Sequence, residues 1–273
     1  MRTSLGLALW SNGRLRFAGT TLDELMRGGE ITEGEEADPA GVTLLAPVES
    51  QEVWACGVTY LRSRAARMEE SVTADVYARA YEAERPEIFF KSAGWRVVGH
   101  HGDIGIRPDS TWNVPEPELA VLSNHAGEVV AYAVGNDMSS RSIEGENPLY
   151  LPQAKVYDRS CSIGPAAVLA SEVDPLRSEV WMTIERSGEQ IFSGKSSVSE
   201  MVRDPAELTR VLHSAYPLPV GAWLLTGTSL VPAPPFTARA GDVVTIEIDA
   251  VGRLVNHVVT VPHSGATARP RIA

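Results

Sequence analysis

The segment WNVPEPELAVL, residues 112–122, places two carboxylates at the head of an apolar run. Glu116 and Glu118 are separated by Pro117, and Pro115 precedes them both. A proline fixes its own φ and favours an extended conformation in the residue before it, so this stretch is predicted to be extended. In an extended chain, residues i and i+2 point to the same face, so the two carboxylates are expected side by side.

Two neighbouring carboxylates need compensation, because they repel each other and one of them tends to hold a proton. A divalent cation removes this conflict, and oxygen ligands suit Mg²⁺, Mn²⁺ or Ca²⁺. Pro117 cannot donate a hydrogen bond to a sheet, which places it at a strand end, an edge or a bulge, where a site can open. The next apolar strand ends at Asp137, a natural third ligand. On spacing alone, exposed acids in turns remain the alternative.

Other polar residues lie at similar positions. Lys155 precedes the apolar pair 156–157, so a desolvated lysine suited to proton transfer is one interpretation and a surface lysine is the other. Thr226 and Thr228 flank Gly227, and a glycine permits close approach of the backbone to a ligand. Their hydroxyls could bind a substrate carboxylate, or the segment could be a plain turn.

Length and composition limit the classes of function. A chain of 273 residues suffices for one large domain, or a large one with a small one. The net charge of −11 disfavours binding to nucleic acid or to anionic membranes. No apolar run reaches about 18 residues and no signal peptide is recognised, so we expect neither a membrane span nor export, and a cytoplasmic location. Cys56 and Cys161 are expected to be buried free thiols.

Residues 1–48 are predicted to form a small N-terminal domain, and residues 49–273 the main domain. Within the first, LGLALW and RLRFAG flank the Asn12-Gly13 dipeptide, a strong hairpin signal, and a helix is expected over 21–29. The main domain is expected to be rich in strands. These are predicted over 52–58, 87–92, 128–139 and, as a closing hairpin, 242–261, with helices over 73–84 and 204–216.

The motifs, taken in order, resemble those of the fumarylacetoacetate hydrolase superfamily over roughly residues 50–262. No single motif is specific, but their order and spacing are. They are VWACGVTY, IFFKS, VVGHHGDI, PEPELAV, VGNDMSSR, AKVYDRSCSIGP, LLTGTS and GDVVTIEIDAVGRLVNHV. The resemblance implies an α+β, β-rich fold, a fumarylacetoacetate hydrolase-like mixed β-roll behind a small N-terminal domain, and a homodimer or homotetramer.

The resemblance also implies a ligand set and an active-site lysine. The family binds Mg²⁺ through two glutamates and an aspartate, which match Glu116, Glu118 and Asp137, and its lysine matches Lys155. One departure matters. Hydrolases of the family carry a His-Glu pair in the first loop, where this sequence has Ser63 and Ala66. Hydrolysis of a carbon–carbon bond by that route is therefore not expected.

The segment SRSIEGENPLYLPQAKVYDRSCSIGP, residues 140–165, is similar to the 2-keto-3-deoxy-arabinonate dehydratases. This similarity implies a Mg²⁺-dependent lyase that dehydrates a 2-keto-3-deoxy sugar acid to a 2-oxo semialdehyde through a metal-stabilised enolate. Lys155 is expected to act as the base or to stabilise the enolate. Glu87 is a candidate to protonate the departing hydroxyl, and a surface acid at a helix end is the alternative. The residues expected to bind the small 2-keto acid are Lys91, Arg141, Thr228 and Ser63.

Two other functions stay open at this point. One is a hydrolase or decarboxylase of acylpyruvate or oxaloacetate, which the missing His-Glu pair disfavours. The other is a non-catalytic metal-containing oligomer, which Lys155 beside three carboxylates disfavours.

Overall fold

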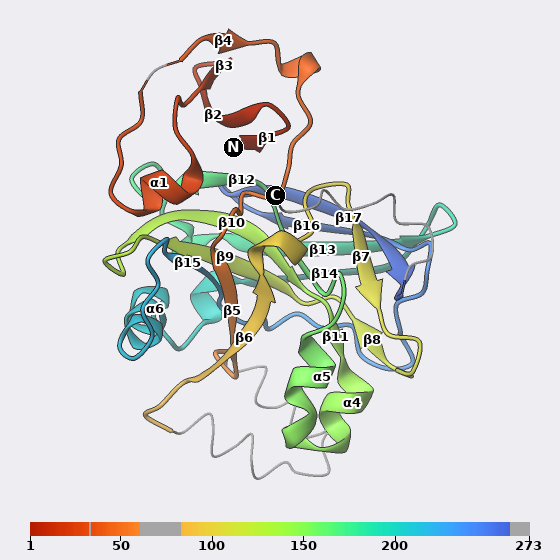
Figure 1. Cartoon of the computed structure of the whole chain (residues 1–273). Helices are drawn as coiled ribbons and strands as arrows, with labels where there is room; N and C mark the ends of the chain where they lie inside the picture. The colour runs from red at the N-terminus through yellow and green to blue at the C-terminus, as the bar shows by residue number, and fades with distance from the viewer. Residues whose placement is uncertain (33, 61–82, 263–273) are drawn as a thin grey trace.

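A computed structural model describes residues 1–32, 34–60 and 83–262 of the chain. Its N-terminal part is a four-stranded antiparallel sheet in the order β1-β2-β3-β4, at the top of Figure 1. The strands are β1 (Arg2–Thr3), β2 (Gly6–Ser11), β3 (Arg14–Phe17) and β4 (Glu36–Ala37). Asn12 and Gly13 join β2 to β3 with φ values of 51° and 75°, as a tight hairpin turn requires, so the predicted hairpin is confirmed.

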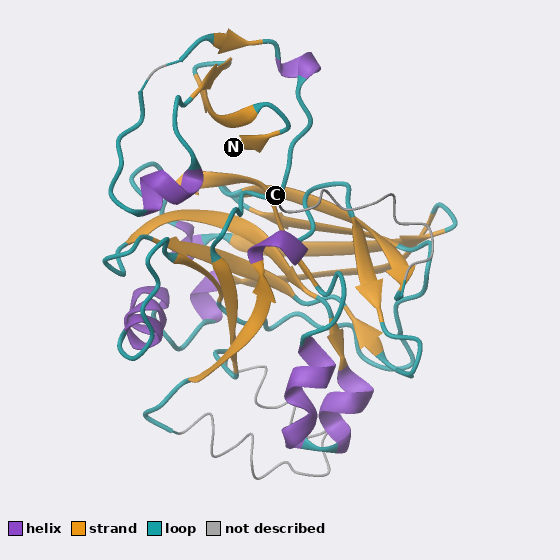
Figure 2. Ribbon diagram, viewed as in Figure 1, coloured by secondary structure: helices purple, strands orange, loops and turns teal. Residues whose placement is uncertain are grey.

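The described residues after β4 contain three further sheets, which dominate Figure 2. The six-stranded sheet has the order β12 (Cys161–Leu169), β10 (Val129–Asp137), β9 (Pro117–Ser123), β15 (Ala222–Leu225), β5 (Glu52–Gly57) and β6 (Glu87–Ala93). The five-stranded sheet has the order β14 (Glu189–Ser197), β13 (Glu179–Arg186), β16 (Val243–Ile248), β17 (Gly252–Thr260) and β7 (Asp103–Ile106). A small sheet pairs β11 (Ser139–Ser140) with β8 (Asn113–Val114).

Both large sheets are mixed. The β15–β5 and β17–β7 pairs are parallel, while the other pairs described in these sheets are antiparallel. The predicted strands over 52–58, 87–92 and 128–139 and the closing hairpin are therefore confirmed as β5, β6, β10 and the β16–β17 pair. The β-rich fold class expected from the sequence is confirmed as well.

Side chains of β9 point alternately to its two faces, and each face contributes to a different hydrophobic core. Leu119 and Val121 pack with the inner face of the five-stranded sheet, whereas Ala120 and Leu122 pack on the opposite side. On that opposite side lies the N-terminal helix α1 (Leu22–Met26), which begins with a capping box between Thr21 and Glu24. β9 is therefore buried on both faces, which anchors the carboxylates at its start in a rigid setting.

Short helices surround the sheets. They are α4 (Arg141–Glu146), α5 (Leu151–Lys155) and α6 (Pro205–His213), with 3₁₀ turns η1 (Pro39–Gly41), η2 (Gly94–Arg96), η3 (Pro148–Tyr150), η4 (Pro175–Arg177) and η5 (Val198–Glu200). The Asp204 side chain caps α6 by accepting from the Ala206 N–H, and Leu208 and Leu212 pack against β15. The prediction of a helix over 204–216 is thus confirmed. The one over 73–84 falls almost entirely outside the described residues.

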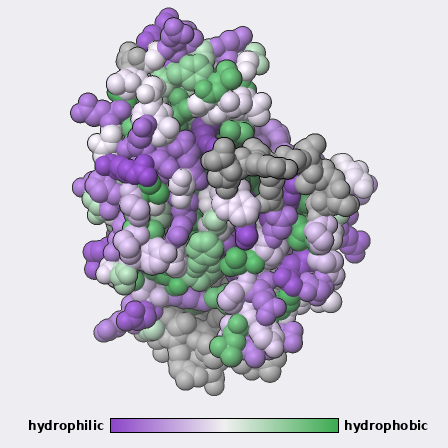
Figure 3. Space-filling view, viewed as in Figure 1, coloured by the Kyte–Doolittle hydropathy of each residue, from purple (hydrophilic) through white to green (hydrophobic). Residues whose placement is uncertain are grey.

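The described helices are all too short or too polar to cross a lipid bilayer. On the face drawn in Figure 3, hydrophobic residues form small groups between hydrophilic ones. Cys56 and Cys161 are buried and unpaired with each other, as expected.

Candidate active site

Three carboxylates meet where β9 begins and β10 ends. The antiparallel register places Glu118 opposite Gly135, and the Asp137 N–H donates to the Glu116 carbonyl at 3.0 Å. Glu116 and Glu118 are each 2% exposed, and Asp137 is 1% exposed. One oxygen from each carboxylate lies within 4.8 Å of the others. The i, i+2 prediction from the two prolines is confirmed, and exposure of these acids in turns is ruled out.

Each of the three carboxylates is held by a different fixed donor. Arg141 Nε donates to Glu116 Oε1 at 2.9 Å, and the Gly227 N–H donates to Glu118 Oε2 at 2.6 Å. Lys91 Nζ lies 2.5 Å from Asp137 Oδ1. These contacts orient the three side chains, so that one oxygen of each carboxylate can take part in the cluster.

This donor set fits a divalent cation. The cluster consists of hard carboxylate oxygens, and two oxygens on opposite sides of a Mg²⁺ or Ca²⁺ ion lie about 4 to 5 Å apart, which agrees with the observed spacing. The electrostatics of the cluster also favour a bound cation. Burial raises the pKa of Glu118 well above its usual range, and the charges of Asp137 and Glu116 add to the shift, whereas Lys155 and the Gly227 N–H oppose it. A bound cation would stabilise the ionised form that burial disfavours.

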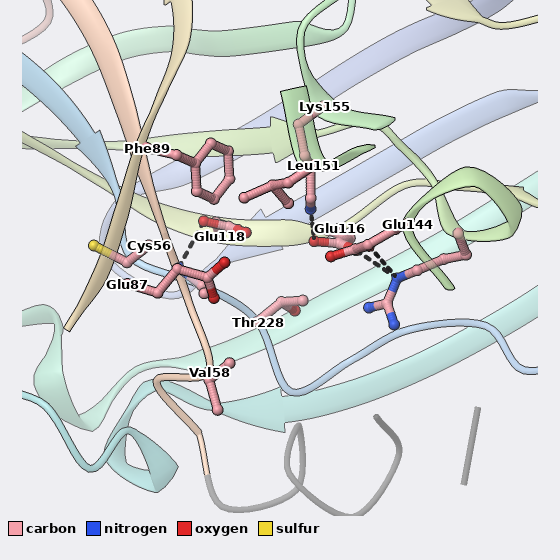
Figure 4. Close-up of a pocket in the computed structure, with 13 residues that line it drawn as sticks. Cys56, Val58, Glu87, Phe89, Glu116, Glu118, Glu144, Leu151, Lys155 and Thr228 are labelled. Atoms are coloured by element: carbon pink, nitrogen blue, oxygen red, sulfur yellow. Dashed lines mark hydrogen bonds and ion pairs between the residues drawn. The ribbon is translucent and has the colours of Figure 1, made fainter. Parts of the chain in front are cut away.

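Lys155, the last residue of α5, lies directly against the cluster (Figure 4). Its Nζ donates to Glu116 Oε2 at 2.7 Å, to Asp137 Oδ2 at 2.9 Å and to Ser139 Oγ at 2.6 Å. The residue is 2% exposed, so it is not a surface lysine. An amine held at a cluster that can bind a metal is well placed to move a proton to or from a bound substrate.

A small polar cavity adjoins Glu116, Glu118 and Lys155. In Figure 4, Glu87 and Thr228 extend into it beside Glu118, and Leu151 and Phe89 lie on the Lys155 side. The full lining is Cys56, Gly57, Val58, Glu87, Phe89, Glu116, Glu118, Arg141, Glu144, Leu151, Lys155, Gly227 and Thr228. The cavity therefore combines the proposed metal cluster with further polar groups that could contact a small polar molecule.

Gly57, at the end of β5, makes room for Glu87 on the neighbouring strand. A Cβ at position 57 would overlap the Glu87 carboxylate and lie 2.7 Å from its Cδ. We expect Gly57→Ala to displace this carboxylate and to lower kcat by about 100-fold, since a shift of about 1 Å can cost that much. Gly41→Ala, which meets no atom within 4 Å, is the matched control. Equal kcat in the two variants, measured by steady-state kinetics, would show that the position of the Glu87 carboxylate does not matter for turnover.

The structure brings most of the predicted site residues together, with two exceptions. Glu116, Glu118, Arg141, Lys155, Thr228 and Glu87 line the cavity, and Asp137, which does not line it, completes the acidic triad. Lys91 does not line it, because this residue lies behind Asp137 with no exposed surface. The predicted substrate contact of Ser63, and the departure at Ala66, lie outside the described residues.

Sequence reasoning missed Glu144. This carboxylate is 3% exposed, lines the cavity and lies 3.7 Å from Arg141 Nε. The signal that could have found it is the i, i+3 spacing of the two residues on α4, which brings side chains together on one helix face.

Comparisons with known proteins agree with this geometry. A curated relative from Haloferax volcanii, named probable 2-keto-3-deoxyxylonate dehydratase, is 51% identical over 249 residues, 90% of this chain and 85% of the relative. Another, the 2-dehydro-3-deoxy-D-arabinonate dehydratase of Saccharolobus solfataricus, is 35% identical over 248 residues, 89% of this chain and 80% of the relative.

Solved structures with a similar fold include a dehydratase as well. A 2-keto-3-deoxy-D-arabinonate dehydratase complexed with magnesium and 2,5-dioxopentanoate superposes with a TM-score of 0.83 at 30% identity, covering 93% of this chain and 94% of that one. The family model described as fumarylacetoacetate (FAA) hydrolase C-terminal matches residues 53–259. On this match, the order of the motifs and the shared fold, the chain belongs to the fumarylacetoacetate hydrolase family.

Proposed function

We propose that this protein is a metal-dependent hydro-lyase that dehydrates a 2-keto-3-deoxy sugar acid of five carbons to a 2-oxo semialdehyde. The observation that carries the proposal is the position of Lys155, whose Nζ bridges two carboxylates of a buried acidic triad beside a cavity that also contains Glu87. This arrangement offers a cation site, a proton acceptor and a separate proton donor around one small space.

The reaction requires removal of one proton and departure of one hydroxyl group. A divalent cation held by Glu116, Glu118 and Asp137, for which we propose Mg²⁺, supplies Lewis-acid polarisation of the 2-keto group when it is bound. For this step the Lys155 ammonium first loses a proton to solvent, as the cation takes over the carboxylates that it contacts. Its neutral amine then takes the proton from C3, which is acidic because it neighbours the ketone. Glu87 gives a proton to the C4 hydroxyl as the C4–O bond breaks, and one water leaves.

The second half of the reaction is a proton shift. Loss of water leaves a double bond between C3 and C4. Removal of a C5 proton with return of a proton to C3 moves the double bond to C4 and C5 and gives an enol. Protonation of C4 with loss of the enol O–H proton then makes C5 an aldehyde. No oxidant is needed, because C5 is oxidised while C4 is reduced within the same molecule. Arg141 and Thr228 line the cavity and are proposed to hold substrate oxygens.

The relatives support this choice over the alternatives. The two curated relatives are named as dehydratases of 2-keto-3-deoxy sugar acids, and 2,5-dioxopentanoate is the 2-oxo semialdehyde that a five-carbon substrate would yield. We extend the same substrate class to this chain.

The test is an assay of 2-keto-3-deoxy-arabinonate, acetylpyruvate and oxaloacetate, each with Mg²⁺ and with EDTA. We expect release of semialdehyde from the first substrate alone, and none in EDTA. Equal turnover of acetylpyruvate or oxaloacetate would replace the proposal with hydrolysis or decarboxylation. Binding of the keto acids without turnover of any of them would indicate a non-catalytic binding protein.

Glu87→Gln separates the two proton transfers. The amide keeps the shape of the side chain but cannot deliver a proton, so we expect kcat for dehydration to fall about 10² to 10⁴-fold. Exchange of the C3 protons with D₂O, followed by NMR, should persist because Lys155 is intact. Loss of exchange in parallel with dehydration would contradict the role of Glu87. The matched control is Glu84→Gln, which alters an exposed glutamate just before the same strand.

Three broader expectations accompany the function. We propose a division into domains at residues 48 and 49, an assembly as a homodimer or homotetramer, and a cytoplasmic location, without nucleic-acid or membrane partners. Size-exclusion chromatography with light scattering measures the assembly directly, and a monomer would contradict it.

A further inference from the structure

The sequence contains three lysines, at positions 91, 155 and 195, against 21 arginines. Lys195 is on the surface, where its Nζ lies 3.0 Å from Glu179 Oε1. The other two are buried and lie next to each other at the acidic triad. Lys155 has a place in the proposed reaction, but Lys91 has no contact with the cavity. The role of this second buried lysine therefore needs an explanation.

Lys91 extends from β6 into a fully enclosed space, with 0% of its surface exposed. Its Nζ lies 2.5 Å from Asp137 Oδ1 and donates to the Met138 carbonyl at 3.1 Å and to the Lys155 carbonyl at 2.5 Å. An ammonium group has three N–H donors and no acceptor. Two of these donors are used by backbone carbonyls, the charge is paired with Asp137, and complete burial keeps Nζ away from a substrate.

These acceptors belong to two separate parts of the site. Asp137 and Met138 are at the end of β10, whereas the Lys155 carbonyl ends α5. We propose that Lys91 is a positioning residue, which fixes the proposed metal ligand Asp137 and the backbone of Lys155 at a set distance from each other. The sequence-based expectation that Lys91 binds substrate oxygens is replaced by this role.

Neighbouring contacts support the proposal. Ser160 Oγ also donates to the Lys155 carbonyl, at 2.8 Å, and the Tyr157 hydroxyl donates to the Met138 carbonyl at 3.2 Å. Both carbonyls thus have two donors each, which holds the chain around Lys91 in one arrangement. A buried ammonium is costly unless it is paired and hydrogen-bonded, and Lys91 is paired with Asp137 and donates to two backbone carbonyls.

The first test measures metal binding without substrate. The inference rests on the proposed metal site, but not on the proposed reaction, so the readout is the Kd for Mn²⁺ measured by electron paramagnetic resonance. Loss of a group that orients a ligand typically weakens metal binding 10 to 100-fold, and we expect this for Lys91→Met. Lys195→Met is the matched control and should bind as the wild type does. An unchanged or lower Kd for Lys91→Met would overturn the proposal.

The second test uses the wild-type protein, so it does not depend on whether Lys91→Met folds. Labelling with ¹⁵N-lysine gives three side-chain ammonium groups for NMR. We expect the Lys91 protons to exchange with water at least about tenfold more slowly than those of Lys195, because they are buried and bonded. Mg²⁺ should shift the Lys91 and Lys155 signals and leave Lys195 unchanged. Exchange at the Lys195 rate, or a Lys91 signal that Mg²⁺ does not move, would overturn the proposal.

The two proposals fail in different ways. If the wild type turned over none of the 2-keto acids but still bound Mn²⁺, the proposed reaction would be wrong and the role of Lys91 would still be decided by the Kd. If the wild type bound neither Mn²⁺ nor Mg²⁺, the metal site itself and the role of Lys91 toward it would both be wrong.

Discussion

Lys155→Met removes the group that we assign to take the C3 proton, and we expect kcat for dehydration to fall about 10³ to 10⁴-fold. General acid–base catalysis by one positioned side chain contributes up to about this factor. Exchange of the C3 protons with D₂O should be lost together with dehydration, in contrast to Glu87→Gln, where exchange continues. The combination of the two variants therefore assigns the order of the proton transfers.

Metal binding by Lys155→Met gives the internal control. The ammonium of Lys155 contacts Glu116 Oε2 and Asp137 Oδ2, and methionine leaves these oxygens to the cation. We therefore expect Mn²⁺ to bind at least as tightly as in the wild type, which shows that the site is intact while activity is lost. If the variant kept more than a tenth of the wild-type kcat, another group would have to be the base.

Glu118→Gln is expected to abolish metal binding and to lower kcat/KM about 10³-fold, since Lewis-acid stabilisation contributes several kcal/mol and each 1.36 kcal/mol is a factor of ten. Glutamine has the same shape and can still accept the Gly227 N–H, so the fold should persist. The measurement is the Tm with and without Mg²⁺. We expect Mg²⁺ to raise the Tm of the wild type and to leave that of the variant unchanged.

The pH dependence of the metal-free protein follows from the same residue. Because the pKa of Glu118 is raised in the folded state, the native protein binds more protons than the unfolded chain above the ordinary carboxyl pKa. The free energy of unfolding should thus fall as the pH rises, and Glu118→Gln should weaken this dependence. Glu128→Gln, which changes an exposed glutamate in the β9–β10 hairpin, is the matched control.

The activity of Glu118→Gln tests the metal site separately. Full activity of this variant in metal-free buffer would refute the assignment of Glu118 as a metal ligand.

Local rules were enough for several parts of the fold. The Asn12-Gly13 turn, the capped helix after Asp204 and the alternation along β9 each depend on neighbouring residues, so their patterns are visible in the chain. The pairing of Glu116 with Glu118 is of the same kind, because two prolines impose the extended geometry that brings them to one face.

Other features of the site depend on residues that are distant in the chain. Lys91 and Asp137 are 46 positions apart, and their strands β6 and β10 have three other strands between them in the sheet, so neither sequence distance nor strand pairing predicts their contact. Nothing in the segment EIFFKS distinguishes a lysine that faces a substrate from one enclosed behind a metal ligand. The enclosed position of Lys91, outside the cavity lining, therefore could not be predicted from this segment.

Local geometry and the order of motifs in the chain were enough to predict a site with three acids and a lysine, and a small keto acid as its substrate. Long-range packing of the two mixed sheets decided the rest of the site. It determined which oxygens face one another, which donors each carboxylate has, and which lysine reaches the cavity. The physical reason is that dihedral preferences and periodicity act over a few residues, whereas burial and charge pairing act through space.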